Sequence, residues 1–178
     1  MKTEVRFSGV GGQGIVLAGR LLGKAAALFD GKHAVCTQSY GPEARGGASR
    51  ADVVISDAPV DYPFVRDADV LVVFFQEAYA KFQPRLRPGS MVILDNELVQ
   101  HVDGDENTFG LPATRIAEEL GSRLATNVVM LGYLIGKTGI VSRKSAEESI
   151  RATVKKSVVD LDLQALDAGI QAAKDDNS

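Results

Sequence analysis

The chain has 178 residues, of which 45% are hydrophobic and 24% are charged, and its formal net charge is −3. These values are typical of one globular domain, and because no basic stripe is present they argue against a nucleic-acid partner. The start of the chain resembles a strand rather than a signal peptide, and no apolar run is long enough to span a bilayer. We expect a single domain over residues 1–178, with a frayed tail at 175–178 and no membrane contact.

An alternating segment at 3–8 predicts the first strand, and the apolar stretch 13–29 predicts a helix that is buried on more than one side. Further strands are predicted at 33–38, 49–56, 69–75, 91–94 and near 107–111. Further helices are predicted at 77–82, 113–120, 127–137, from Ser142 or Ser145 to about 157, and at 163–174. This alternation predicts an α/β fold: a single Rossmann-like, doubly wound, mostly parallel sheet with helices on both faces.

A glycine-rich turn, Gly9-Val10-Gly11-Gly12-Gln13-Gly14, follows the first predicted strand directly. In this G-x-G-x-x-G spacing Gly9 would make the turn, Gly11 would let a ligand approach the backbone, and Gly14 would let the helix pack against the strand. The helix start also offers N–H groups and a positive dipole end to an anion. An NAD site would place a carboxylate near the end of the second strand, but residues 35–39 hold none, which counts against NAD and NADP.

A second shaped segment, 38–47, contains Tyr40, Glu43 and Arg45. It follows the second predicted strand, so it should leave the carboxyl edge of the sheet beside the glycine turn, where open α/β sheets bind ligands. Arg45 is suited to hold a phosphate or carboxylate in a bidentate way, or it pairs with Glu43 or other neighbours. The residues alone leave both readings open.

Few residues are available for chemistry. Cys36 is the only cysteine, so this chain alone holds neither an internal disulfide nor a cysteine-ligated iron–sulfur cluster, and a reduced, cytoplasmic setting is expected. His33 and His101 are the only histidines, and no nucleophile–base pair, carboxylate dyad or metal cluster is identified. We expect no catalytic residue and no metal ligand, and interpret the chain as a binding or docking domain. Gly132 and Gly136, one helical turn apart, predict close approach of another helix or of a partner subunit.

The glycine turn, the segment Gln38-Ser39-Tyr40-Gly41-Pro42-Glu43-Ala44-Arg45-Gly46-Gly47 and Gln76-Glu77-Ala78-Tyr79 together resemble the gamma subunit of 2-oxoacid:ferredoxin oxidoreductases. Their order and spacing match, and the resemblance covers essentially the whole chain. The long segment is most similar to the 2-oxoglutarate synthase branch, because the pyruvate branch tends to carry another arginine in place of Ala44. A pyruvate- or indolepyruvate-specific subunit remains an alternative, as does a stand-alone nucleotide-binding oxidoreductase.

The resemblance implies a complex that decarboxylates a 2-oxoacid to an acyl-coenzyme A and passes electrons to ferredoxin. Thiamine diphosphate and Mg are then expected on alpha and beta subunits, and iron–sulfur clusters on beta or on a ferredoxin-like delta subunit. The gamma chain itself would serve assembly or coenzyme A docking. The residues expected at that docking edge are Gly9, Gly11, Gly12, Gln13, Gly14, Tyr40, Glu43 and Arg45.

Overall fold

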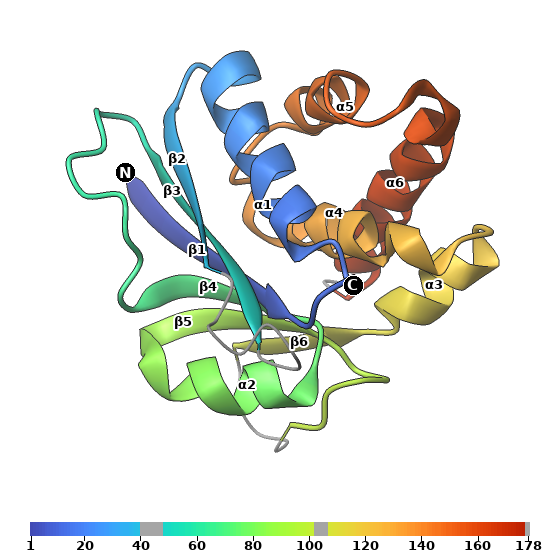
Figure 1. The fold of residues 1–178 in the computed structure, drawn as a ribbon, viewed down its shortest axis with the longest axis horizontal. Helices are drawn as coiled ribbons and strands as arrows, with labels where there is room; N and C mark the ends of the chain where they lie inside the picture. The colour runs from blue at the N-terminus through green and yellow to red at the C-terminus, as the bar shows by residue number, and fades with distance from the viewer. Residues whose placement is uncertain (40–47, 102–106, 177–178) are drawn as a thin grey trace.

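The computed structural model describes residues 1–39, 48–101 and 107–176. Strands and helices alternate in the first part of the chain, and helices alone form the last part (Figure 1). The elements are β1 (Lys2–Gly9), α1 (Ile15–Lys24), the π-helical turn η1 (Ala25–Phe29), β2 (His33–Ser39), β3 (Ser49–Ser56), β4 (Ala68–Val73), α2 (Gln76–Phe82), η2 (Gln83–Arg85), β5 (Leu86–Asp95), β6 (Thr108–Leu111), α3 (Ala113–Glu119), the 3-10 turn η3 (Arg123–Ala125), α4 (Thr126–Thr138), α5 (Arg143–Arg151), η4 (Lys156–Val158) and α6 (Val159–Asp175).

The six strands of the described residues form one sheet in the order β2-β3-β1-β4-β5-β6. β1, β4, β5 and β6 pair in parallel, whereas β3 is antiparallel to both β1 and β2. The mostly parallel sheet is therefore confirmed, with β3 reversed. The reversal follows from chain length, because the short connection between β2 and β3 cannot make the crossover that a parallel neighbour requires.

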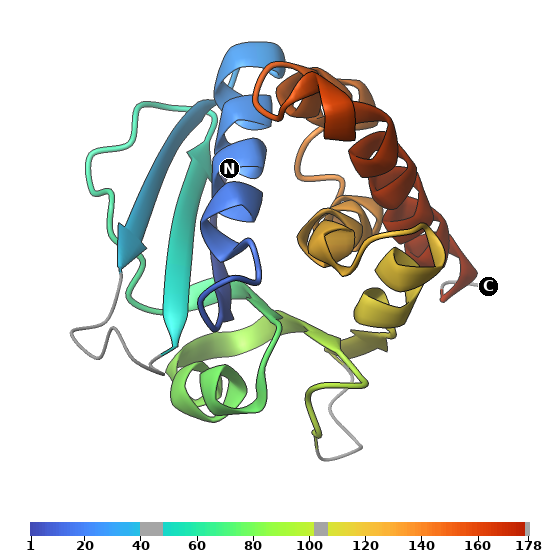
Figure 2. The same cartoon turned by 45° about the vertical axis from the view of Figure 1, so that its right-hand side comes forward.

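Helices cover both faces of the sheet, as expected (Figures 1 and 2). Val5 and Phe7 of β1 pack into the larger core with α1, α3, α4, α5 and α6. Leu71 and Val73 of β4 point to the opposite face and pack with α2. Successive strand residues alternate between faces, so the continuous apolar run in β4 fills both cores at once.

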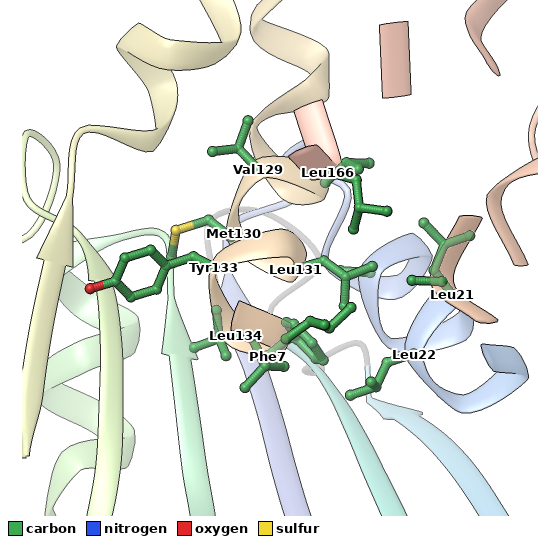
Figure 3. Packing of buried hydrophobic residues seen from close by; sticks show 14 of the residues in the cluster. Phe7, Leu21, Leu22, Val129, Met130, Leu131, Tyr133, Leu134 and Leu166 are labelled. Carbon is green, nitrogen blue, oxygen red and sulfur yellow. The ribbon is translucent and has the colours of Figure 1, made fainter. Parts of the chain in front are cut away.

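Helix α4 lies at the centre of the larger core and is buried from Thr126 to Ile135. Figure 3 shows its Leu131 and Leu134 near Phe7 of β1, with Val129 on the side of Leu166. A Cβ added to Gly132 would lie 2.2 Å from the Leu166 carbonyl oxygen, so the backbones of α4 and α6 are in direct contact there. Gly136 likewise faces α6, and the glycine pair therefore packs within this chain.

Some predicted boundaries were wrong. The strand predicted at 91–94 is longer, because β5 begins at Leu86. The N-cap of α5 is Ser142, whose Oγ accepts a hydrogen bond from the Ser145 N–H at 3.1 Å, so Ser145 is not the cap. The helix also ends at Arg151, and α6 begins at Val159.

At the C-terminus, α6 continues to Asp175, which was predicted to belong to the frayed tail. Asp176 accepts a hydrogen bond from the Tyr133 hydroxyl of α4, while residues 177 and 178 of the predicted tail lie outside the described residues. None of the helices in the described ranges is long and apolar enough to cross a membrane.

Candidate functional site

The glycine turn between β1 and α1 is fastened to the end of β4 by the side chain of Gln13. Its Oε1 accepts a hydrogen bond from the Val10 N–H at 2.8 Å, and its Nε2 donates to the Phe74 carbonyl at 3.0 Å. A Cβ on Gly9 would lie 2.4 Å from that Oε1. Gly9 is the last residue of β1 and paired with β3, so it makes room for Gln13 rather than forming the turn itself.

Gly12 and Gly14 give the turn its shape, with φ angles of 89° and 73° in the left-handed region that favours glycine. Gly14 also lies against α4, because its carbonyl accepts a hydrogen bond from Asn127 Nδ2 at 3.2 Å and an added Cβ would meet that nitrogen at 2.4 Å. The predicted packing role of Gly14 is therefore toward a helix, not a strand. Asn127 was missed from the sequence, although a polar side chain at the start of an apolar helix was a usable signal.

Gly11 faces open space, because no atom beyond the adjacent residues lies within 4 Å of a Cβ built on it, and the same holds for Gly12. It borders a hollow of about 340 Å³, which extends from Val10 past the start of α1 to Ser49 of β3. A second hollow of about 140 Å³ lies on the other side of Gly12, between Gln13, Phe74 and η3. The turn thus separates two hollows at the carboxyl edge of the sheet.

The N-termini of the helices at this edge differ in whether a side chain accepts hydrogen bonds from their free N–H groups. At α3, Asp95 Oδ2 accepts hydrogen bonds from the Thr114 N–H at 2.9 Å and the Thr114 hydroxyl at 2.6 Å. That carboxylate already complements the positive end of α3. At α1 the N-cap is Gly14, which offers no side-chain hydrogen bond. The start of α1 is therefore the better place for an external anion.

Tyr40, Glu43 and Arg45 lie outside the described residues. The strands that flank them are described: Ser39 at the end of β2 pairs with Arg50, and Gly9 pairs with Ser49 at the start of β3. Both ends of segment 40–47 therefore leave the same edge as the glycine turn, as the sequence predicted. However, β3 separates β2 from β1, which moves the end of β2 about 10 Å from the turn at the usual strand spacing. A dinucleotide cannot span the two in the usual way.

Polar side chains at the ends of β4 and β5 form hydrogen bonds within the chain. Gln76 and the backbone of Gln100 exchange two hydrogen bonds, at 2.6 and 3.2 Å. Asp95 fastens β5 to the start of α3, as given above. In the part of the chain that the structure describes, no three His, Cys, Asp or Glu side chains are grouped so that they could hold a metal ion.

The fold and the carboxyl edge of its sheet define the class of protein as an open α/β domain with a glycine turn. A dinucleotide-binding domain would also carry a ribose-binding carboxylate near the end of the second strand, and residues 35–39 hold none. Residues 4–172 match the family model of pyruvate ferredoxin/flavodoxin oxidoreductase. The chain belongs to this family, as a gamma-type subunit of a 2-oxoacid:ferredoxin oxidoreductase.

The 2-oxoglutarate synthase subunit KorC of Methanocaldococcus jannaschii is 48% identical over 179 residues, covering 98% of this chain and 96% of that protein. The crystal structure of a keto/oxoacid ferredoxin oxidoreductase gamma subunit from Geobacter sulfurreducens superposes with a TM-score of 0.87 at 38% identity, covering 97% of this chain and 99% of that one. The 2-oxoglutarate:ferredoxin oxidoreductase of Magnetococcus marinus, with 2-oxoglutarate, coenzyme A and succinyl-CoA bound, shares the fold at a TM-score of 0.85 and 24% identity. That match covers 98% of this chain and 31% of the other.

Proposed function

We propose that this chain, residues 1–178 as one domain, is the gamma subunit of a cytoplasmic complex that converts 2-oxoglutarate and coenzyme A to succinyl-CoA and CO2 while reducing ferredoxin. The observation that supports this substrate is the 48% identity to a 2-oxoglutarate synthase subunit along almost the entire chain. The proposed partners are alpha and beta subunits that hold thiamine diphosphate and Mg, and a ferredoxin-like delta subunit. Iron–sulfur clusters are placed on these partners and not on this chain.

The substrate proposal is tested by co-expressing the chain with its partner subunits and purifying the complex through a tag on this chain. Ferredoxin reduction is then measured with 2-oxoglutarate, pyruvate, 2-oxoisovalerate and indolepyruvate, each with and without coenzyme A. We expect the highest kcat/KM with 2-oxoglutarate. A preference for pyruvate or indolepyruvate would replace the substrate but keep the subunit role, whereas a chain that purifies alone would contradict both.

Within the complex, we propose that the glycine turn docks an anionic part of coenzyme A. Three described features support this: the start of α1 lacks a side-chain cap, Gly11 faces open space, and a hollow of about 340 Å³ lies beside it. Helix starts with exposed N–H groups bind phosphates well. Arg45, and with it Tyr40 and Glu43, is proposed to close this docking edge from the neighbouring segment.

Gly11→Ala tests the docking role without straining the fold, because its φ is not in the left-handed region and the added methyl meets no protein atom. We expect the apparent KM for coenzyme A to rise at least fivefold, with thiamine diphosphate binding and the KM for the oxoacid unchanged. Arg45→Ala should act in the same direction. Arg66→Ala is the matched control, because Arg66 lies between β3 and β4, at the opposite edge of the sheet. Unchanged coenzyme A kinetics in both variants would remove this role.

A further inference from the structure

A cavity of about 350 Å³ opens between α1, η3, η4 and the start of α6, outside the glycine turn. Most of its wall is apolar, and the side chains that matter here are Leu17, Leu124, Val154, Val158, Leu161 and Asp162. Its size is that of a site that takes a side chain or small group. None of the described residues that were predicted from the sequence as a binding edge lines it.

Asp162 is the unusual member of this wall. The residue is 7% exposed, and its carboxylate, which keeps some accessible surface in the cavity, forms no hydrogen bond or ion pair with any group of the described residues. The other deeply buried aspartates are satisfied: Asp52 accepts hydrogen bonds from the Arg6 guanidinium at 2.7 and 2.9 Å, and Asp95 binds Thr114. A carboxylate that is buried without a partner is costly, so such groups normally have a donor when the protein is functioning.

Apolar side chains at the mouth of the cavity are exposed. Leu124 is 80% exposed and Val158 is 37% exposed, although both line this cavity. Leu124 also lines the smaller hollow beside Gly12, so the cavity adjoins the glycine-turn edge at this side chain. Exposed leucine and valine around a buried charge form the kind of patch that a partner protein covers.

We propose that this cavity is a docking socket for a partner subunit of the oxidoreductase, which inserts a lysine or arginine side chain onto Asp162 and packs apolar side chains on Leu124 and Val158. The inference deepens the proposed function and rests on the chain acting within a complex. Charge complementarity argues for a basic side chain, since Asp162 is an acceptor that lacks a donor. The position beside the glycine-turn edge argues for a subunit of the same complex.

Among the described residues, no cation fills this role. Arg20 and Lys155 also line the cavity, but neither forms an ion pair with the Asp162 carboxylate. A buried pair of opposite charge that forms only on docking contributes specificity, because a wrong partner would leave Asp162 unpaired.

The test measures the affinity of this chain for the co-expressed remainder of the complex, using Asp162→Asn and Leu124→Ser. Asp160→Asn is the matched control, because Asp160 lies in the same first turn of α6 but is exposed and outside the cavity. We expect Asp162→Asn and Leu124→Ser each to raise the Kd at least tenfold and Asp160→Asn to change it less than twofold. Carbodiimide cross-linking followed by peptide mapping should join Asp162 to a lysine of a partner subunit where that residue is lysine.

Affinities within twofold of wild type for both cavity variants would overturn the inference while leaving the subunit role intact. Equal weakening by Asp160→Asn and Asp162→Asn would also overturn it, because general attraction of charge would then explain the effect. Asp162-dependent self-association of the isolated chain would assign the cavity to a second copy and refute a partner subunit. If the wild-type chain joins no complex, the proposed function fails and this inference with it.

Discussion

Asp162→Asn should stabilise the isolated chain, although it removes a charged group at the start of a helix. Burial raises the pKa of Asp162 to about 6 from an ordinary value of 3.8. The folded state therefore binds a proton more readily than the unfolded chain between these values, and stability falls as the pH rises through this window. The difference of about two pH units corresponds to about 3 kcal/mol at a pH above 7.

Asparagine keeps the shape of the side chain but carries no charge, so it avoids that penalty. The unpartnered amide retains some desolvation cost, and we therefore expect a gain of about 2 kcal/mol at pH 8. For a chain of this length the melting temperature should rise by roughly 4–8 °C. At pH 4 the carboxyl is neutral in the folded wild-type chain and close to half protonated in the unfolded chain, so most of the gain should be lost.

The assay is urea unfolding of the isolated chain from pH 4 to pH 8, with Asp160→Asn as the control for loss of charge near the start of α6. Arg20 and Lys155 line the same cavity as Asp162. A loss of stability at pH 8 would show that Asp162 is already paired in the free chain, and a gain that does not depend on pH would show that its buried charge is not the cause. The reasoning for the docking socket would then lose its main support.

Three further substitutions test the packing around the site. Gly14→Ala should lower the free energy of unfolding by about 3 kcal/mol, because alanine is strained at a φ of 73° and its Cβ would clash with Asn127. A lower melting temperature in thermal unfolding would check this. Gly132→Ala should lower the free energy of unfolding by at least about 3 kcal/mol, because the added Cβ forces α4 away from α6. An unchanged midpoint of denaturant unfolding would contradict the backbone contact. Asp30→Ala should cost about 1 kcal/mol near neutral pH. Burial raises the pKa of Asp30, but hydrogen bonds from the serines at the start of α5 outweigh this effect, so the pKa is lower than in the unfolded chain. The stability that Asp30 contributes should therefore disappear as the pH falls below about 4, which unfolding at several pH values can show.

The strands were predictable because their apolar patterns are strong and short. The apolar run around Leu71 and Val73 predicted a strand, and the structure places its two faces in two cores. The direction of β3 was not predictable from its own alternation, because a half-buried strand has the same pattern in either direction. It depends on the length of the connection from β2, which becomes informative only when the neighbours of β3 are known.

The glycine turn was predicted in place but not in detail. G-x-G-x-x-G spacing cannot distinguish a glycine needed for its φ angle, such as Gly12, from one needed because another side chain lies against it, such as Gly9 beside Gln13. The sequence did not indicate the docking socket around Asp162, because an aspartate in the first turn of a helix is an ordinary feature. Only burial without a partner makes it unusual, and that property belongs to the packing of α1, η3 and α6.

The contact between α4 and α6 has a consequence for how this chain can change over time. A Cβ added to Gly169 would lie 2.0 Å from the Val129 carbonyl oxygen, and one added to Gly132 would lie 2.2 Å from the Leu166 carbonyl oxygen. A crowded pair of side chains can be relieved by shortening either one, but here both helices already carry the smallest residue. No second substitution at the contact can compensate for a first, so suppressor screens on a Gly132 variant should find rescuing changes elsewhere in the chain or none at all.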